Sequence, residues 1–118
     1  MHTIIPGMLC QDGKPVMPFG VMGGQYQANG HARVLTNMID YGMAPQAALD
    51  APRSFAELGH LKVERSYDPK EVQKLADIGH KIEQAIKPIG GAQAIMVHEN
   101  GVLEGASDPR KDGCALGY

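Results

Sequence analysis

The stretch Gly20-Val21-Met22-Gly23-Gly24-Gln25 places three glycines at the end of an apolar segment and just before a strongly patterned helix. Glycine lets a ligand approach the main chain closely. The start of a helix adds free N–H groups and a partial positive charge, which suit an anion or an oxyanion. A tight connection between a strand and a helix would use the same glycines. The stretch therefore predicts a strand-to-helix junction that is either purely structural or able to bind an oxyanion.

The glycines do not form a known nucleotide-binding loop. The Gly-Lys-Ser or Gly-Lys-Thr of a Walker loop does not follow them. The GxGxxG spacing and the βαβ context of a dinucleotide site are missing as well. We therefore predict no cofactor.

Before this stretch the sequence predicts a β-hairpin. Two apolar segments, from Thr3 to Cys10 and from Pro15 to Met22, flank an Asp12-Gly13 pair, which is a strong turn signal. Pro15 and Pro18 cannot donate backbone hydrogen bonds. Part of the second strand should therefore lie at a sheet edge or at a bulge.

After the stretch the sequence predicts two helices. The first spans His31 to Tyr41, with Asn29 as its N-cap and Gly42 as its stop. Four apolar residues share one face of this helix: Val34, Leu35, Met38 and Ile39. The second helix begins at Pro45, a good first-turn residue, and runs to Asp50.

The remaining elements complete an α+β pattern with strands at both ends and helices between them. We predict a small hairpin from residues 54–57 and 61–64, and a helix that begins at Asp68-Pro69-Lys70-Glu71 and ends at Gly79. The buried face of that helix should consist of Val72, Leu75, Ala76 and Ile78. A strand is possible at residues 81–86. A final hairpin, Ala92 to Glu99 and Val102 to Ser107, turns at Asn100-Gly101, and its first strand should be buried on both faces.

Composition limits the class of protein. At 118 residues the chain forms one domain, residues 1–118, and its net charge of −2 argues against a nucleic-acid partner. No apolar run is long enough to cross a membrane, and no signal peptide is recognisable. Cys10 and Cys114 lack metal-type spacing and should be reduced thiols, which favours the cytoplasm.

Few side chains in the sequence suggest chemistry. Cys10 lies in an apolar strand and should be a buried, inert thiol. The five histidines show no HxxxH or HExxH spacing, so we predict no metal site. Asp108-Pro109-Arg110 is typical of a turn in which the carboxylate pairs with the guanidinium or with backbone donors. Arg53, which follows Pro52, should clamp a loop. Most methionines should fill gaps in the core.

Several motifs in order resemble the C-terminal part of the gamma-glutamyltranspeptidase family. The resemblance covers essentially the whole chain and favours the branch that contains oxamate amidohydrolase-like members. The motifs that carry it are Gly20-Val21-Met22-Gly23-Gly24, residues 35–43, residues 48–53, Gly79-His80, Gln93-Ala94-Ile95, residues 105–110 and the closing residues 113–118.

The resemblance implies an N-terminal-nucleophile hydrolase with an αββα sandwich, of which this chain lacks the upstream strands. Members cut themselves as proenzymes and free a threonine whose hydroxyl attacks an amide carbonyl. Gly23 and Gly24 match the glycine pair whose N–H groups stabilise the oxyanion. The family's substrate-gripping serine pair falls at His2 and Thr3, and Gln25 adjoins the glycines. These three residues are therefore assigned to binding a small, carboxylate-bearing amide.

The leading hypothesis is a fragment of an amide-cleaving or acyl-transferring enzyme. The catalytic threonine should lie upstream of residue 1, so this chain should be inactive alone and should form a homodimer over its exposed apolar surface. Two alternatives are a non-catalytic binding or assembly module and an independent hydrolase with Cys10 as the nucleophile. In members of the family the location can also be periplasmic.

Overall fold

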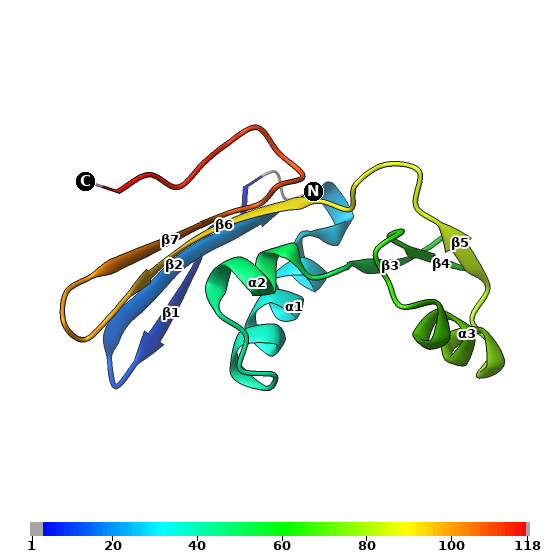
Figure 1. Cartoon of the computed structure of the whole chain (residues 1–118), viewed down its shortest axis with the longest axis horizontal. Coiled ribbons are helices and arrows are strands. Elements are labelled where there is room, and N and C mark those ends of the chain that lie inside the picture. Colours follow the sequence, from blue (N-terminus) through cyan, green and yellow to red (C-terminus); the bar gives the residue numbers. More distant parts are fainter. Residues whose placement is uncertain (1–3, 118) are drawn as a thin grey trace. The chain divides into compact units, whose positions relative to one another are not determined.

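The computed structural model describes residues 4–117, which form two compact units (Figure 1). The first unit combines the chain before residue 51 with the chain after residue 89, and the second is Ala51–Ile89. Each unit has its own β-sheet. The α+β class that the sequence predicts is confirmed.

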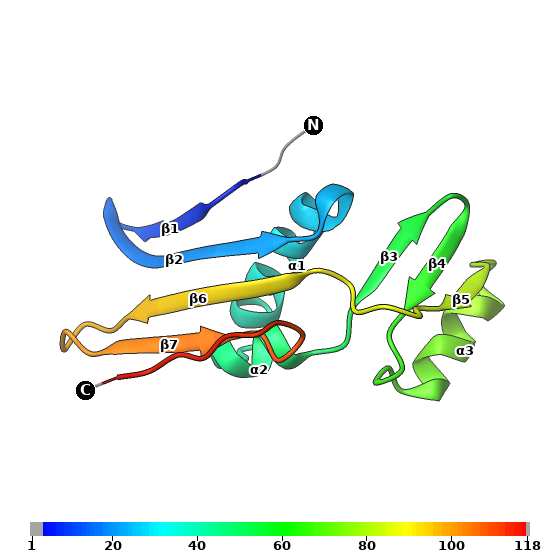
Figure 2. The ribbon, with the colours of Figure 1, turned by 90° about the horizontal axis from the view of Figure 1, so that it is seen from above.

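The first unit is a four-stranded antiparallel sheet with helices on one face. The strands β1 (Gly7–Gln11), β2 (Lys14–Met22), β6 (Gly91–Val97) and β7 (Leu103–Ser107) lie in the order β1-β2-β6-β7 (Figure 2). The 3₁₀ turn η1 (Gly24–Tyr26) leads into α1 (Gln27–Ile39), and α2 (Pro45–Asp50) follows. Both helices cover one face of the sheet, while the C-terminal segment returns over the other (Figure 1).

The core of this unit lies between the sheet and the two helices. Alternate residues of β2, Met17, Phe19 and Val21, are buried on the helical side. Val34 of α1 and Leu49 of α2 pack into the same layer, and complete burial of a leucine contributes about 2 kcal/mol. The residues of β6 and β7 that face the helices are small: Ala92, Ala94 and Ala106.

Two predictions for the first hairpin are confirmed: its turn at Asp12-Gly13 and a bulge in its strand pairing. Asp12 and Gly13 have φ values of 50° and 76°, which a two-residue hairpin turn requires. The register between β1 and β2 shifts between Leu9, which pairs with Met17, and Cys10, which pairs with Pro15. β2 pairs with β6 only from Phe19 onward, so neither proline has to donate a hydrogen bond to β6.

The first helix begins earlier than the sequence predicts. α1 starts at Gln27, so Asn29 lies within its first turn and is not the N-cap. The 3₁₀ turn continues directly into the helix, and its last residue, the buried Tyr26, anchors the junction. The predicted apolar face is also wrong at its end, because Ile39 is 64% exposed.

Strand β6 is buried on one face only, contrary to prediction. Ala92 and Ala94 are buried beneath the helices, whereas Gln93 and Ile95 on the other face are exposed. Although most residues of β6 are apolar, only the face of the strand that lies under the helices is buried. The prediction that the methionines fill gaps in the core is confirmed for Met17 and wrong for Met8 and Met22, which are about half exposed.

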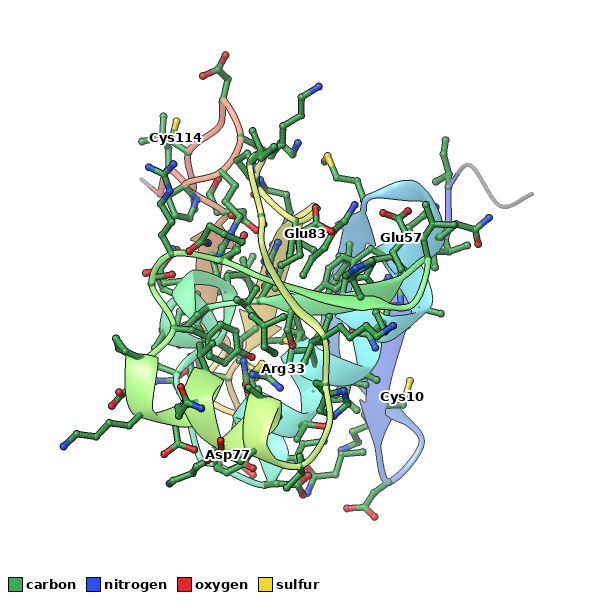
Figure 3. All side chains as sticks on the ribbon, turned by 90° about the vertical axis from the view of Figure 1, so that its right-hand side faces the viewer. Cys10, Arg33, Glu57, Asp77, Glu83 and Cys114 are labelled. Carbon is green, nitrogen blue, oxygen red and sulfur yellow. The ribbon has the colours of Figure 1, made fainter. Side chains whose placement is uncertain are left out.

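Cys10 is exposed, which corrects the prediction of a buried thiol. It lies on the edge strand β1, next to the register shift, while α1 packs on β2 and α2 packs on β6 and β7. The side chains of Cys10 and Cys114 lie apart at the surface, on β1 and on the C-terminal segment, and both are free thiols (Figure 3).

The second unit is a three-stranded sheet with one helix. Strands β3 (Ser54–Glu57), β4 (His60–Val63) and β5 (Ile82–Gln84) lie in that order, antiparallel and then parallel. Helix α3 (Pro69–Asp77) begins as predicted, since the Asp68 carboxylate accepts the Lys70 N–H at 2.8 Å. Its apolar face is less buried than predicted: Val72, Leu75 and Ala76 are half-buried, and Ile78 is 75% exposed.

None of the helices in residues 4–117 has the length and apolar character that a membrane crossing requires.

Candidate functional site

The glycine pair after β2 adopts a backbone that L-residues rarely adopt. Gly23 has φ 138° and ψ 27°, and Gly24 has φ 59°. The first conformation is open essentially to glycine alone, and the second lies in the left-handed region. Both residues are exposed. We call Gly23 and Gly24 the glycine cradle.

Two carbonyl groups of the cradle are held by the helix that follows. The Tyr26 N–H donates to the Gly23 carbonyl at 3.1 Å. The Gly24 carbonyl accepts from the backbone N–H of Gln27 and, at 3.1 Å, from its side-chain Nε2. Within residues 4–117 the N–H groups of Gly23 and Gly24 have no acceptor. The cradle therefore carries two backbone donors without an acceptor in residues 4–117, in exposed residues at the entrance of a helix, where the helix dipole favours negative charge.

The other residues that the sequence assigns to substrate binding are only partly described. Gln25 is exposed and directly follows the cradle. His2 and Thr3 lie outside the described residues, so the structure does not place them.

His31 supports the end of β2 before the cradle, a contact that sequence reasoning missed. Its Nε2 accepts the Val21 N–H at 3.1 Å, and its ring centroid lies 4.9 Å from that of Phe19. Partial burial lowers the pKa of His31 below its ordinary value of 6.5. The neutral imidazole is the form that can accept this hydrogen bond. The sequence spacing between Val21 and His31 contains no signal for the contact.

Asp108 and Arg110 lie at the same end of the sheet as the cradle, since β7 ends where β6 begins and β2 ends. The Asp108 carboxylate accepts the Ala92 N–H at 2.8 Å and the Arg110 N–H at 2.9 Å. The Arg110 guanidinium contacts Asp108 at 3.2 Å and donates to the Leu49 carbonyl at 2.8 Å. These contacts join the sheet to the C-terminal end of α2.

Gln46 adds a second link between α2 and the sheet. Its side-chain amide donates to the Ser107 carbonyl at 2.9 Å and accepts the Ser107 N–H at 3.0 Å. An amide side chain thus makes both hydrogen bonds that a neighbouring strand would make to this residue of β7. No feature of the sequence singles out Gln46 for this contact.

Arg53 belongs to a buried cluster within the second unit. The Glu64 carboxylate accepts the Arg53 N–H at 2.9 Å and the Ile89 N–H at 3.0 Å. The Arg53 guanidinium donates to the Ile89 carbonyl at 3.0 Å. The structure thus brings together the two ends of this unit through Arg53, Glu64 and Ile89.

The described part of the chain contains no group of three or more His, Cys, Asp or Glu side chains that could hold a metal ion. The chemistry that its geometry offers is donation of backbone hydrogen bonds at the cradle.

The sequence of the chain matches a protein family and several of its members. The family model for gamma-glutamyltranspeptidase matches residues 1–118. The chain is 42% identical to the glutathione hydrolase-like YwrD proenzyme of Bacillus subtilis over 98% of its length, and 35% identical to the oxamate amidohydrolase proenzyme of Klebsiella pneumoniae over 99%. It spans 24% of the length of each of these two relatives.

Comparison with solved structures finds proteins of the same family. The gamma-glutamyltranspeptidase from Pseudomonas nitroreducens, solved in complex with L-DON, superposes with a TM-score of 0.89 at 25% identity. The match covers 100% of this chain and 63% of that chain.

Proposed function

Because the chain belongs to the gamma-glutamyltranspeptidase family, we propose that it is the C-terminal part of an amide-cleaving or acyl-transferring proenzyme. The relatives that it matches are proenzymes, and the chain corresponds to about a quarter of their length. The observation that carries the proposal is the glycine cradle: two exposed residues at a helix entrance whose N–H groups have no acceptor within residues 4–117. Such a pair of donors suits the negative oxygen that develops when a nucleophile attacks an amide carbonyl.

In this proposal the nucleophile is a threonine supplied by the upstream part of the proenzyme. Its hydroxyl attacks the amide carbon and its own α-amine takes the proton, which gives a tetrahedral oxyanion. The oxyanion accepts hydrogen bonds from Gly23 and Gly24. Collapse expels the amine with the proton and leaves an acyl-enzyme, which water or a second amine then releases. One such donor contributes about 3 kcal/mol to transition-state stabilisation.

The proposed substrate is a small amide that carries a carboxylate. One relative is named for oxamate and others for glutathione, and both compounds are carboxylate-bearing amides. Gln25, beside the cradle, and the undescribed His2 and Thr3 are the residues of this chain that we assign to the substrate. The histidine in place of the first serine of the family's pair is a reason to favour a smaller substrate than glutathione.

We also propose that the helix-free face of the first unit's sheet is covered in the assembled protein. A mainly apolar groove of about 580 Å³ opens there, with Met8, Pro18, Gly20 and Ile95 among its lining residues. Apolar surface of this kind marks interaction sites. In the proenzyme the upstream part of the chain covers it, and in isolated residues 1–118 a second copy does so. Light scattering over a range of concentrations should show a dimer of the isolated chain, and a monomer at every concentration would contradict this.

The function is tested in the complete, matured proenzyme with oxamate, glutathione and simpler carboxylate-bearing amides. The proposal expects amide cleavage and, by mass spectrometry after rapid acid quenching, an acylated threonine. Residues 1–118 alone should be inactive. Gly24→Ala should lower kcat, because φ 59° strains an alanine and relief of that strain turns the peptide that carries one of the two donors. An acyl group on Cys10, or amide cleavage by the isolated chain, would contradict the proposal.

A further inference from the structure

A third glycine, Gly90, lies directly against the cradle. Its Cα is 3.0 Å from the position that a Cβ on Gly23 would occupy. A Cβ on Gly90 would lie 2.5 Å from the Met22 carbonyl oxygen and 2.7 Å from Cδ1 of Tyr26. Gly90 has φ 68°, so both its conformation and its surroundings require glycine.

One edge of the Tyr26 ring faces three glycines. Cδ1 of Tyr26 lies within 3.4 Å of the Cβ positions of Gly23, Gly30 and Gly90. Gly30 comes from α1, and its Cβ position is also 2.5 Å from Val21 Cγ1. The Tyr26 side chain is 2% exposed. The ring therefore packs between the end of β2, the first turns of α1 and the residue before β6, in close-packed surroundings that transmit small displacements.

These contacts fix the direction of the cradle's donors. In a planar trans peptide the N–H points opposite to the carbonyl of the preceding residue. The Met22 carbonyl lies against Gly90, which sets the direction of the Gly23 N–H. The Gly23 carbonyl accepts from the Tyr26 N–H, which sets the direction of the Gly24 N–H. A rotation of either peptide would turn the N–H that it carries away from its present direction.

We propose that Gly90 and Tyr26 are positioning residues for the oxyanion cradle. Neither touches the substrate; both act through the peptides of Gly23 and Gly24. This inference rests on the proposed function of the cradle and adds to it the residues that hold the donors in their productive direction. Preorganised donors stabilise the transition state more than the bound substrate, so loss of their alignment changes kcat rather than KM.

The test is Gly90→Ala in the complete, matured enzyme. We expect kcat to fall about 10- to 100-fold, less than for complete loss of a donor, with KM changed by no more than about twofold. Affinity for an alkyl boronic acid, which forms a tetrahedral adduct with the nucleophile, should weaken in parallel with kcat. Gly42→Ala is the matched control: its φ of 65° imposes the same backbone strain, but its Cβ meets open space. Its kcat should stay near the wild-type value.

Tyr26→Leu provides a second variant if Gly90→Ala does not fold. It keeps the backbone N–H that holds Gly23 and much of the buried apolar volume, but it removes the ring edge between the glycines. We expect a loss in kcat and in boronate affinity with little change in KM. Wild-type kcat in folded Gly90→Ala or Tyr26→Leu, or an effect confined to KM, would overturn the inference.

Gly23→Ala separates this inference from the function on which it rests. If Gly23→Ala loses activity while both positioning variants keep theirs, the oxyanion role stands and the positioning role fails. If Gly23→Ala keeps wild-type kcat, the oxyanion role fails and the positioning role fails with it.

Discussion

Asp108 and Ala92 form a reciprocal pair of hydrogen bonds across the end of the first unit's sheet. The Asp108 carboxylate accepts the Ala92 N–H at 2.8 Å, and the Asp108 N–H donates to the Ala92 carbonyl at 3.1 Å. The Asp108 side chain is fully buried. The pair closes the sheet two residues from Gly90, so it stabilises the end of the unit at which the proposed oxyanion cradle lies.

Asp108→Asn should destabilise the protein by about 3 kcal/mol, because an amide NH₂ would face donors at one of the two positions where the carboxylate now accepts hydrogen bonds. Urea unfolding followed by circular dichroism measures the change. Asp112→Asn is the matched control, since Asp112 is exposed in the same segment and its replacement should cost little. Equal stability of the two variants would show that the buried carboxylate is not needed.

Stability should fall as the pH drops below neutrality, in part through His31. The pKa of His31 is lower in the folded protein than its ordinary value of 6.5, so the unfolded chain binds the proton more readily. The contribution of the neutral imidazole is complete above 6.5 and is lost as the pH falls through the folded-state pKa. Urea midpoints measured from about pH 7.5 to pH 5 should show this trend.

His31→Gln is the control for this pH dependence. Glutamine does not titrate but offers an oxygen that can accept the Val21 N–H. The slope of stability against pH in this range should be smaller in the variant. An unchanged slope would mean that other groups account for it.

Asp68→Ala should weaken the start of α3 by about 1 kcal/mol, the usual cost of losing an N-cap acceptor. Hydrogen exchange of the amides in the first turns of α3 should accelerate. Asp77→Ala, at the C-terminal end of the helix, removes a carboxylate from the negative end of the dipole and should not accelerate it. Equal exchange rates in both variants would contradict the capping role.

Local signals in the sequence predict two of the hairpin turns and the starts of α2 and α3. Asp12-Gly13 and Asn100-Gly101 lie at the hairpin turns, where Asp12, Gly13 and Gly101 have positive φ. Pro45 and Asp68-Pro69 lie at the starts of α2 and α3. These features depend on a few neighbouring residues, which a sequence displays directly.

The misplaced features depend on contacts between distant segments. The start of α1 depends on the burial of Tyr26 against residues of β2 and the segment before β6. The exposure of Ile95 and Cys10 depends on which face and which strands the helices cover. The His31 contact with Val21 and the Gln46 contact with Ser107 join residues that become neighbours only after folding.

The sequence predicts the two glycines of the candidate site but not Gly90, which packs against them. The sequence indicated Gly23 and Gly24, because glycines before a helix suggest a bared main chain, and the family resemblance suggested their role. The packing of Gly90 against them arises from the antiparallel pairing of Met22 with Gly91. Gly23 and Gly90 are 67 residues apart in the sequence (90 − 23), so only the folded sheet brings them together.

The most direct test of the account is the kcat of Gly23→Ala in the complete, matured enzyme, measured beside Gly42→Ala. Alanine cannot adopt φ 138° at Gly23 without strain, and its Cβ would meet the Gly90 Cα at 3.0 Å, so the cradle must reorganise. The account predicts that kcat falls about 100-fold or more with an intact fold, while Gly42→Ala stays near wild type. Wild-type kcat in Gly23→Ala would contradict the claim that these glycines bind the oxyanion.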